Sequence, residues 1–563
     1  MSVLSFRLPD CALCIIARSR RAAAEAIVKL QDEFDYIVVG GGAAGCVLAA
    51  RLSEDAACKV ALIEAGGRDN NMLVTIPAGF WLSLKTGLFN WKYTTEPQKN
   101  LNDRTIYWPR GKILGGSGAI NGMVYIRGVA SDYNTWSQLG NRGWSYHDCL
   151  PFFKKTEGWF GGNTEYHNAA GPFKVTRFGV KHPLQKAFVE AGMQAGFPYN
   201  DDFNSGDQEG FGPLDCNIFE AKRINTARAL LHPAQKRANL SIITRALASK
   251  VSVEKGRAVG VEFYQGRSVR VLRAAREVIV SAGAVNSPQL LQLSGIGPAD
   301  HLRSLGIDVA CDLPGVGDNL QDHLVAGLKQ KISQPISFMR GTEPHNVLRY
   351  FIQYLATKSG PAAYHGVEAI AFLRSRKELA DPDLQIHMTN MMYEDNGRKI
   401  IKEHGFMPYF NLSRPESRGY IRIKSSDPRK HPEIQPNYFQ RQADIDVMRA
   451  GFKLCREIVA QPAFDPFRAE ELSPGTRVAT DREIDAWLRA NSETIYHPVG
   501  TCKMGHDDMA VVDDRLRVRG VERLRVIDAS VMPTLVSGNT QAPTVMIAER
   551  GADFIRNPDN WAQ

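Results

Sequence analysis

The chain has 563 residues, 44% hydrophobic and 23% charged, a composition typical of a folded globular protein rather than a disordered or fibrous one. This length exceeds that of one ordinary domain, so we expect at least two. The 69 Lys and Arg residues outnumber the 60 Asp and Glu residues and give a net charge of +9. Since the basic residues form no long block, nucleic-acid binding is not expected.

Residues 1–31 differ from the rest of the chain. A short apolar patch, CALCII, is followed by three arginines and an alanine-rich stretch. A secretory signal would place its positive charges before the apolar region. A transit peptide is an alternative, although Asp10 and Glu25 argue against it. We expect an extension that lies outside the fold.

The nine cysteines are an odd number at scattered positions, which suits reduced thiols in a cytosol-like compartment better than a disulfide framework. Cys11 and Cys14 form a single C-x-x-C without the partners of a zinc site, so no metal is expected. No apolar run reaches the roughly 18–20 residues of a membrane-spanning helix, and no amphipathic anchor is evident. We expect a cytoplasmic protein with at most peripheral attachment to the inner membrane.

The first motif is DYIVVGGGAAGCVLAARL, in which an apolar strand at residues 36–39 runs into glycines and then a helix of small residues. Gly40, Gly42 and Gly45 have the G-x-G-x-x-G spacing, which provides a tight turn, a close approach of backbone to pyrophosphate, and close packing of helix on strand. A second strand, KVALIEAGG, places Glu64 where an acid binds ribose hydroxyls. Together these features predict a dinucleotide site.

Two later segments repeat the logic of a strand followed by a turn. REVIVSAGAVNSPQLLQLSGIG predicts a strand at residues 278–280 and a helix whose first turn lies near Pro288. LRVIDASVMP predicts a strand that leads into Asp528. Such returns to the nucleotide-binding sheet suit an extended FAD better than NAD.

Four segments resemble the glucose–methanol–choline (GMC) oxidoreductases, which are FAD-dependent enzymes that oxidise alcohols. They are the nucleotide motif, RGKILGGSGAINGMVYIRG, GAVNSPQLLQLSGIG, and YHPVGTCKMG together with SGNTQAPTVMIAERGAD, and they span about residues 34–555. The resemblance implies an α/β plus α+β architecture. In it, a Rossmann-like FAD-binding domain is interleaved with a substrate domain built on a large antiparallel sheet flanked by helices.

On this resemblance we expect a discontinuous FAD-binding domain and a substrate domain inserted into it. The FAD-binding domain should combine residues 32–160, 222–325 and 508–563, and the substrate domain residues 161–221 and 326–507. The segment GYIRIKSSDP, residues 419–428, alternates polar and apolar residues as a strand with one exposed face does. Nothing in the sequence indicates the oligomeric state.

The resemblance also implies which residues contact FAD. Some relatives attach the flavin covalently to a histidine in the Gly-Gly loop, whereas this chain has Ile120 there, so noncovalent FAD is expected. A helix started by Pro543 would direct the positive end of its dipole at the pyrimidine side of the flavin. The expected contact residues are Gly40, Gly42, Gly45, Glu64, Arg110, Gly115, Gly116, Ser117, Asn121, Gly122, Met123, Val124, Ala282, Asp528, Ala529, Asn539, Thr540 and Gln541.

His497, in YHPVGTCKMG, is the candidate base for removing the hydroxyl proton of an alcohol. Thr480 and Glu483 have the spacing of a capping box, which predicts a helix over 480–496, and Pro498 then favours an extended conformation for His497. From the residues alone, a structural histidine is the alternative. No ligand cluster supports a metal site, and nothing supports a cysteine nucleophile. The GMC resemblance implies that His497 is the catalytic base.

The second catalytic position of the family is a histidine or an asparagine, and here it is Asn539. Its amide can donate a hydrogen bond to the substrate oxygen or the alkoxide but cannot act as a base. Gln541 replaces an asparagine of many relatives. His323, in DNLQDHL, resembles a recurring family segment and is expected to be structural, at a turn. His506 is expected in a solvated loop.

We expect a primary aliphatic or aromatic alcohol as substrate, with choline as the alternative, because residues 383–424 resemble the branch of choline and alkanol dehydrogenases. A choline site combines a carboxylate with aromatic faces. Glu394 beside Tyr393 is one candidate, although an exposed loop is the simpler interpretation. Electrons are expected to pass to a quinone or another carrier, with oxidase activity as an alternative. A flavin-containing cyanohydrin lyase of the same family is a further alternative.

Overall fold

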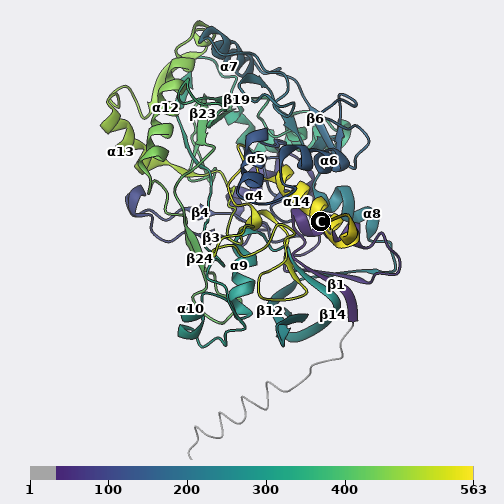
Figure 1. Ribbon diagram of the computed structural model, residues 1–563. Coiled ribbons are helices and arrows are strands. Elements are labelled where there is room, and N and C mark those ends of the chain that lie inside the picture. Colours follow the sequence, from purple (N-terminus) through teal and green to yellow (C-terminus); the bar gives the residue numbers. More distant parts are fainter. Residues whose placement is uncertain (1–32, 562–563) are drawn as a thin grey trace, which may run out of the picture.

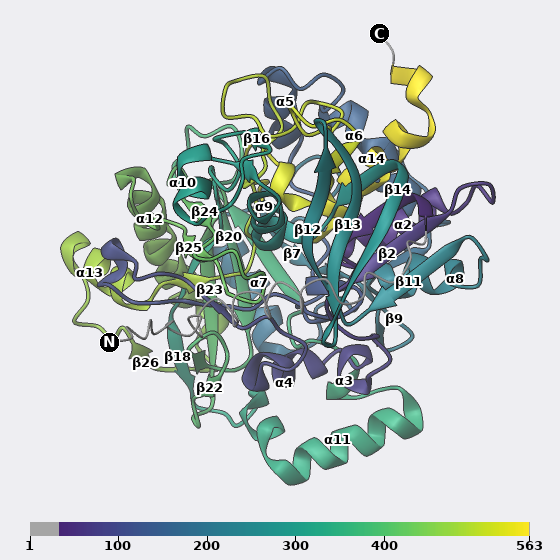
Figure 2. The same cartoon turned by 90° about the horizontal axis from the view of Figure 1, so that it is seen from below.

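A seven-stranded sheet is the first of two large sheets in the computed structural model, which describes residues 33–561. Five of its strands run parallel, in the order β11 (Leu240–Thr244), β2 (Val60–Glu64), β1 (Glu33–Val39), β14 (Ser268–Val280) and β28 (Leu524–Val526). The antiparallel strands β13 (Arg257–Gln265) and β12 (Ala246–Glu254) extend it from the first half of β14 (Figures 1 and 2). Three distant parts of the chain thus build one sheet, which confirms the Rossmann-like part of the predicted fold.

Small and apolar residues allow helices to pack closely against this sheet and against each other. All five residues of β2 are buried, as a parallel strand covered on both faces requires. α2 (Ala43–Leu52) follows β1 and is built mostly from buried small residues. α14 (Gln541–Arg556) packs against α2 and against α6 (Tyr146–Thr156). The C-terminal helix therefore lies beside the first helix of the fold.

α9 (Gly283–Leu293) begins earlier than predicted, and Pro288 lies in its interior rather than in its first turn. Proline lacks the N–H that would bond the carbonyl oxygen four residues before it. That oxygen belongs to Ala284, and it accepts a hydrogen bond of 2.7 Å from the Thr501 hydroxyl. The side chain of Thr501 thus compensates for the missing donor, which local sequence could not indicate.

The second large sheet has eight strands and is antiparallel throughout. Helices α7 (Pro183–Gln194) and α12 (Gln442–Val459) pack on it, with α13 (Asp481–Asn491) beside α12 (Figure 1). This agrees with the predicted large antiparallel sheet flanked by helices. Its strands are β7 (Gly210–Pro213), β17 (Leu324–Gly327), β18 (Lys329–Ile332), β19 (Ala369–Leu373), β20 (Leu384–Thr389), β23 (Gly405–Leu412), β26 (Arg468–Ser473) and β27 (Glu493–Thr494).

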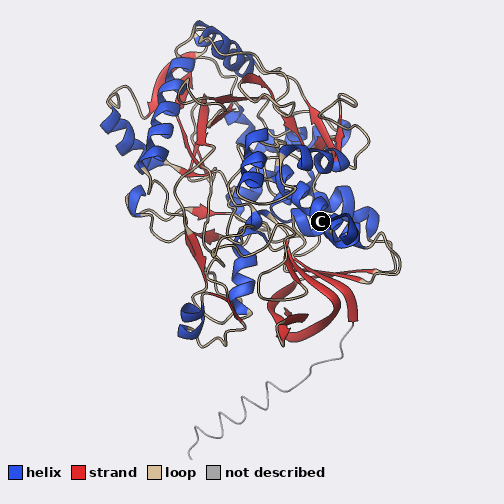
Figure 3. Ribbon diagram, viewed as in Figure 1, coloured by secondary structure: helices blue, strands red, loops and turns tan. Residues whose placement is uncertain are grey.

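The remaining helices and strands lie outside the two large sheets, and Figure 3 shows helices and long loops around both of them. The helices are α3 (Met72–Thr75), α4 (Gly79–Thr86), α5 (Ala130–Gln138), α8 (His232–Ala234), α10 (Ala299–Ser304) and α11 (Pro344–Thr357). The strands are β3 (Tyr93–Thr94), β4 (Tyr107–Trp108), β5 (Glu157–Trp159), β6 (Phe173–Arg177), β8 (Asp215–Cys216), β9 (Ile218–Phe219), β10 (Lys222–Arg223), β15 (Ile296–Gly297), β16 (Cys311–Asp312), β21 (Tyr393–Glu394), β22 (Lys399–Ile400), β24 (Tyr420–Arg422) and β25 (Glu433–Gln435). The domain limits given above stay a prediction.

Two local expectations need correction. The capping box of Thr480 and Glu483 is present, but α13 ends at Asn491 rather than near residue 496. The chain stops being helical there because β27 pairs with β17 of the second sheet. The alternating segment 419–428 does form a strand, β24, but it pairs only with β25 in a two-stranded ribbon outside the large sheet.

Within residues 33–561, no helix combines the length and the apolar composition that crossing a membrane requires. The cysteines of this part of the chain carry free thiols: Cys46, Cys58, Cys149, Cys216, Cys311, Cys455 and Cys502. Cys11 and Cys14 lie outside the described residues, as does the predicted extension 1–31.

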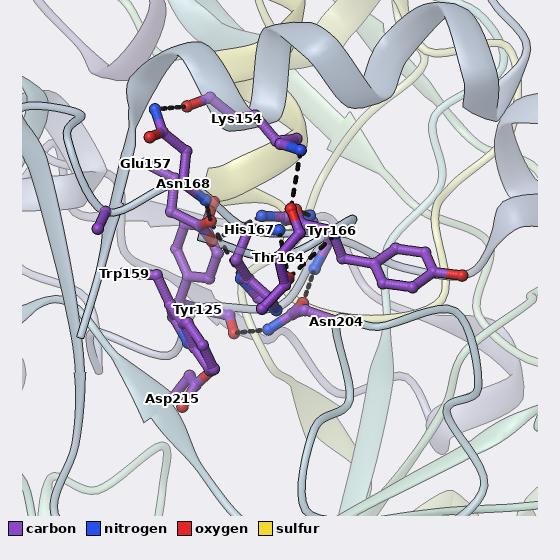
Figure 4. Close-up of polar contacts among 12 residues, drawn as sticks. Tyr125, Lys154, Glu157, Trp159, Thr164, Tyr166, His167, Asn168, Asn204 and Asp215 are labelled. Carbon is purple, nitrogen blue, oxygen red and sulfur yellow. Dashed lines mark hydrogen bonds and ion pairs between the residues drawn. The ribbon is translucent and has the colours of Figure 1, made fainter. Parts of the chain in front are cut away.

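A buried ionic cluster includes Glu157, the first residue of β5, and His167 (Figure 4). The Arg127 guanidinium contacts the Glu157 carboxylate at 2.6 Å. His167 bridges Glu157, 3.0 Å from Nδ1, and Asp202, 2.9 Å from Nε2, while its ring stacks on Trp159. Burial alone would lower the pKa of His167, but its bonds to the two carboxylates raise it. The Arg127 guanidinium and the His167 ring therefore both contact the buried Glu157 carboxylate.

Replacing Glu157 with alanine would leave Arg127 buried without its carboxylate, so we expect a loss of about 3–5 kcal/mol in the free energy of unfolding. Glu522, in an exposed pair with Arg257, is the matched control, and Glu522→Ala should cost less than about 1 kcal/mol. Urea denaturation followed by tryptophan fluorescence measures both losses. Equal losses in the two variants would contradict a special contribution of the buried pair.

Candidate active site

One cavity brings together most of the predicted site residues. The volume of this cavity is about 340 Å³. Its wall is formed by the C-terminal ends of β1 and β2, by the loop that contains residues 109–124, and by residues of β17, β20 and β23. The cavity therefore lies where the two large sheets meet, and ligands of open α/β sheets bind at the same ends of the strands.

The glycine motif shapes one end of the cavity. Gly40 has a φ of +103°, and a Cβ there would lie 2.5 Å from the carbonyl oxygen of Ser281. A Cβ on Gly45 would lie 1.8 Å from the carbonyl oxygen of Gly40, so only glycine permits α2 to start here. A Cβ on Gly42 would meet nothing closer than Gly116, at 3.9 Å. The start of α2 is thus open to a pyrophosphate.

Glu64 ends β2 at the same cavity. Its Oε1 accepts from the Gly66 N–H at 2.6 Å and its Oε2 from the Gly41 N–H at 2.8 Å. Burial raises the pKa of this carboxyl to about 7, although both backbone donors favour the ionised form. A carboxylate has about four acceptor positions, so room remains for ribose hydroxyls. The contact of Glu64 with ribose stays a prediction.

Unused donors in and beside this cavity fit a large ligand rich in acceptors. Within the described chain, Ser281 Oγ and Gln541 Nε2 line the cavity region and are buried without a hydrogen-bond partner. Such groups cost roughly 1–3 kcal/mol each unless a ligand completes their bonds. Behind the loop, the buried Arg223 donates to the Asn121 carbonyl oxygen at 2.7 Å, and its Nη2 has no partner among these residues. Together with the glycine motif, the Ser281 and Gln541 donors that line the cavity fit FAD.

Most residues expected to contact FAD line the cavity, together with His497. They are Gly40, Gly42, Glu64, Arg110, Gly116, Ser117, Asn121, Gly122, Met123, Val124, Ala282, Asp528, Ala529, Asn539, Thr540 and Gln541. Gly45 and Gly115 do not line it. Gly45 packs α2 onto Gly40, and the Gly115 N–H donates to the Gly41 carbonyl oxygen at 2.7 Å. These two glycines shape the cavity from behind.

The Gly-Gly loop is fastened to the start of α14. The Asn121 side-chain amide donates to Gln541 Oε1, and its Oδ1 accepts from the Met123 N–H at 3.1 Å. α14 begins at Gln541, with Pro543 in its first turn, so the positive helix end lies at the cavity as predicted. Ile120 lines the cavity at the position where some relatives have histidine, and the noncovalent attachment stays a prediction.

His497 is held by a chain of hydrogen bonds that determines where its proton lies. His323 Nε2 is 2.9 Å from the Ser413 carbonyl oxygen, an acceptor, so this nitrogen carries a proton. Burial lowers the pKa of His323 to about 4, so the ring is neutral and its Nδ1 accepts. His497 Nδ1, 2.9 Å away, must therefore be the donor. The lone pair of His497 is left on Nε2.

Nε2 of His497 faces the Asn539 amide. Asn539 Oδ1 accepts from the Gln385 side chain at 3.0 Å, so Nδ2 is the atom that lies 3.2 Å from His497 Nε2. Burial is the main cause that lowers the pKa of His497 well below 6.5, and nearby His323 and Arg110 lower it further. The result is a neutral imidazole with an unprotonated Nε2 and an amide donor beside it.

Three of the supporting residues were missed by the sequence interpretation. The Asp322 carboxylate accepts from the backbone N–H of His497 at 2.7 Å and from the Thr494 hydroxyl at 2.6 Å. His323, expected to be a structural residue at a turn, instead contacts the candidate base, and Gln385 orients Asn539. DNLQDHL was noticed as a family segment. Its adjacency to His497 could not be deduced, because these contacts span more than 170 residues.

Aromatic and polar side chains line the cavity beyond His497. Trp81 meets Tyr393 edge to face, and His387 stacks on Tyr409, with ring centroids 5.4 and 5.1 Å apart. Glu493 also lines the wall, and its Oε2 accepts from the Asn396 N–H at 2.8 Å. By contrast, Glu394 is outside the wall and pairs with Lys399 and Lys329. Glu493, rather than Glu394, is therefore the carboxylate at the aromatic wall.

Among residues 33–561, no three His, Cys, Asp or Glu side chains group as metal ligands would.

Known proteins are similar to this chain in sequence and in fold. Family models described as GMC oxidoreductase match residues 34–325 and residues 415–548. The mitochondrial choline dehydrogenase of Homo sapiens is 46% identical over 96% of this chain and 93% of its own length. The oxygen-dependent choline dehydrogenase of Pseudomonas fluorescens is 46% identical over 94% of each. The crystal structure of pyridoxine 4-oxidase from Mesorbium loti is 31% identical, with a TM-score of 0.85, over 93% of this chain and 99% of that one.

The two family models cover most of the chain, in the order that the sequence motifs predicted. The chain belongs to the GMC oxidoreductase family.

Proposed function

We propose that this protein oxidises a primary alcohol to the aldehyde with FAD, and that His497 is the base. One observation carries the proposal: the unprotonated Nε2 of His497 lies beside the Asn539 amide in the cavity that the glycine motif shapes. An alcohol hydroxyl is a very weak acid in water, so its oxidation needs a positioned base and a donor that stabilises the alkoxide.

The cofactor would be held by the residues whose geometry fits it: Gly42 at the start of α2, Glu64 at the end of β2, and the loop from Gly116 to Val124. When bound, FAD supplies the acceptor for the hydride that leaves the alcohol carbon. The oxidation then balances, because the carbon gives up a hydride and the oxygen gives up a proton.

His497 Nε2 takes the hydroxyl proton, while Nδ1 keeps its own proton in the bond to His323. The Asn539 amide, which contacts Nε2 in this structure, can donate to the oxygen of a bound alcohol and hold the alkoxide in line. Asp322 fixes the backbone of His497 and thereby the position of the ring. A cyanohydrin lyase would also require a base, so these residues do not favour the lyase over alcohol oxidation.

Two classes of alcohol are candidate substrates. An uncharged aliphatic or aromatic alcohol fits the apolar and aromatic wall that includes Trp81 and Tyr393. Choline is the second candidate. It is favoured by the 46% identity to proteins named choline dehydrogenase, and by Glu493 beside aromatic faces that attract a quaternary ammonium group. For the electrons we propose a quinone or another carrier as acceptor, with dioxygen as the alternative.

Replacing His497 with alanine should slow anaerobic bleaching of the flavin band by an alcohol about a hundredfold or more, because general-base catalysis contributes roughly 10²–10⁴. Stopped-flow absorbance with hexanol, benzyl alcohol and choline measures the rate. His506→Ala, in an exposed position, is the control and should leave the rate unchanged. Bleaching at the wild-type rate in His497→Ala would reject this residue as the base. No bleaching by any alcohol in the wild type would favour the lyase.

The pH dependence of bleaching should report the lowered pKa of His497. A base works only when unprotonated, and burial lowers its pKa below the ordinary value. The limiting rate should therefore be constant around neutral pH and fall only as the pH drops well below about 6.5. Stopped-flow rates at saturating alcohol give the profile. An apparent pKa of the base at or above that ordinary value would contradict the proposed environment.

Glu493→Gln separates the two substrate candidates. If choline binds against the aromatic wall, loss of the carboxylate should raise its Kd about tenfold, since a close charge contributes of the order of 1–2 kcal/mol. The Kd of benzyl alcohol should not change, and it serves as the internal control. Titration of the bleaching rate gives both constants. A choline Kd that does not respond would leave the uncharged alcohol as the preferred class.

A further inference from the structure

α11 presents an apolar face that the rest of the described chain does not cover. Tyr354 is the buried residue of this helix, whereas Val347, Leu348, Ile352 and Leu355 are 51%, 59%, 57% and 46% exposed. Leu348, Ile352 and Leu355 have the i, i+4, i+7 spacing of one helix face. Figure 2 shows α11 projecting from the body of the protein. These four exposed side chains are called the α11 face below.

Other exposed apolar side chains lie on the same side of the molecule as α11. α11 is fixed by the Tyr354 hydroxyl, which donates to the Ala221 carbonyl oxygen at 2.8 Å, and by packing of Tyr354 with Ile76 between α3 and α4. α3, α4 and α11 lie on the same side of the molecule (Figure 2). Three more large apolar side chains of this region are exposed, at 48%, 42% and 45%: Met72, Leu82 and Leu88.

The charges around the α11 face are mainly positive. Arg349 is exposed on α11 itself and Lys358 directly after it, Arg340 lies just before it, and Lys85 is exposed on α4. Between residues 338 and 358 the only acidic residue is Glu343, which lies 3.4 Å from His345. Exposed apolar side chains flanked by cations are the arrangement by which an amphipathic helix binds an anionic lipid surface.

The α11 face also lies near the cavity. On α4, Phe80, Trp81 and Leu84 line the cavity wall, whereas Leu82 on the same short helix faces outward. Tyr364 and His365 follow α11 in the chain, and His365 also lines the wall. A surface that docked on α11 would therefore lie against elements that form part of the active-site wall.

We propose that the α11 face docks the protein onto an anionic lipid bilayer, with α11 lying in the plane of the membrane surface. At about 1.5 Å per residue its 14 residues measure roughly 21 Å, less than the roughly 30 Å hydrocarbon core, so α11 lies on the bilayer rather than across it. A second copy of the chain is a poorer partner, because it would bring two sets of the same positive charges together. This inference does not depend on the proposed substrate.

The sequence contains this helix, yet no amphipathic anchor was evident from it, and the pattern of residues 344–357 explains why. PHNVLRYFIQYLAT has apolar residues at helical spacing, and such residues are more often covered by the protein's own core. Only the fold shows that Tyr354 faces inward while Leu348, Ile352 and Leu355 face outward.

The test is co-sedimentation of the full FAD-loaded protein with vesicles of phosphatidylglycerol and phosphatidylcholine, compared with vesicles of phosphatidylcholine alone. We expect binding to the anionic vesicles that weakens with added salt. The double variant Leu348→Glu and Ile352→Glu should bind at least tenfold more weakly, and Arg349→Gln more weakly than wild type. Met193→Glu changes an apolar residue on α7 that is 46% exposed, as Leu355 is; it is the matched control and should bind normally.

Three results would overturn the proposal: no binding of the wild type, equal binding to both kinds of vesicle, or normal binding of the double variant. Light scattering measures the molar mass of both proteins in solution. A wild-type dimer that becomes a monomer in the double variant would show that the α11 face binds a second copy of the chain instead of a membrane, and would overturn the proposal. Retained flavin absorbance and unchanged bleaching by a water-soluble alcohol show that a variant is folded. If the double variant fails this check, Ile352→Gln replaces it, and normal binding of Ile352→Gln would count against the proposal.

Discussion

The hydrogen bond between His323 and His497 is the contact on which the chemistry of the site depends. A neutral imidazole has one nitrogen with a proton and one without, and only the second can act as a base. The Ser413 carbonyl oxygen binds the Nε2 proton of His323, and His323 Nδ1 in turn accepts the proton of His497 Nδ1. This chain of hydrogen bonds leaves Nε2 of His497 unprotonated. A backbone group in the loop after β23 thus determines the tautomer of His497.

The same contact joins distant parts of the chain. His323 immediately precedes β17, Ser413 follows β23, and His497 comes from the segment after β27. These strands belong to the antiparallel sheet, whereas the glycine motif and Glu64 belong to the parallel one. A hydride can pass from alcohol to cofactor only if both sheets hold their residues in fixed relative positions. The cavity between them is therefore the functional product of the two-sheet architecture.

Sequence reasoning succeeded where a function depends on local spacing. Gly40, Gly42 and Gly45 are close in the chain because a tight turn and the start of a helix require it, and Glu64 ends the next parallel strand. The fold class and the family followed from four such motifs. Asn539 and His497 were named from the family resemblance, and the structure brings them within 3.2 Å. Their catalytic roles stay predictions.

Sequence reasoning failed where a residue acts through a distant partner. The Thr501 hydroxyl replaces the hydrogen bond that Pro288 cannot make in α9. Pairing of β27 with β17 ends α13 earlier than predicted, and Gln385 orients the Asn539 amide. None of these partners lies within ten residues in the chain, so no periodicity or capping rule could indicate them. Exposure was equally hidden, since α11 looks like any amphipathic helix until the core beside it is known.

The most direct test of this account is the tautomer of His497, measured by ¹⁵N NMR of the protein with labelled histidine, with His497→Ala used to assign the signal. The account predicts a neutral ring at neutral pH with the proton on Nδ1 and a free lone pair on Nε2. A ring that is protonated on Nε2, or on both nitrogens, at that pH would contradict it.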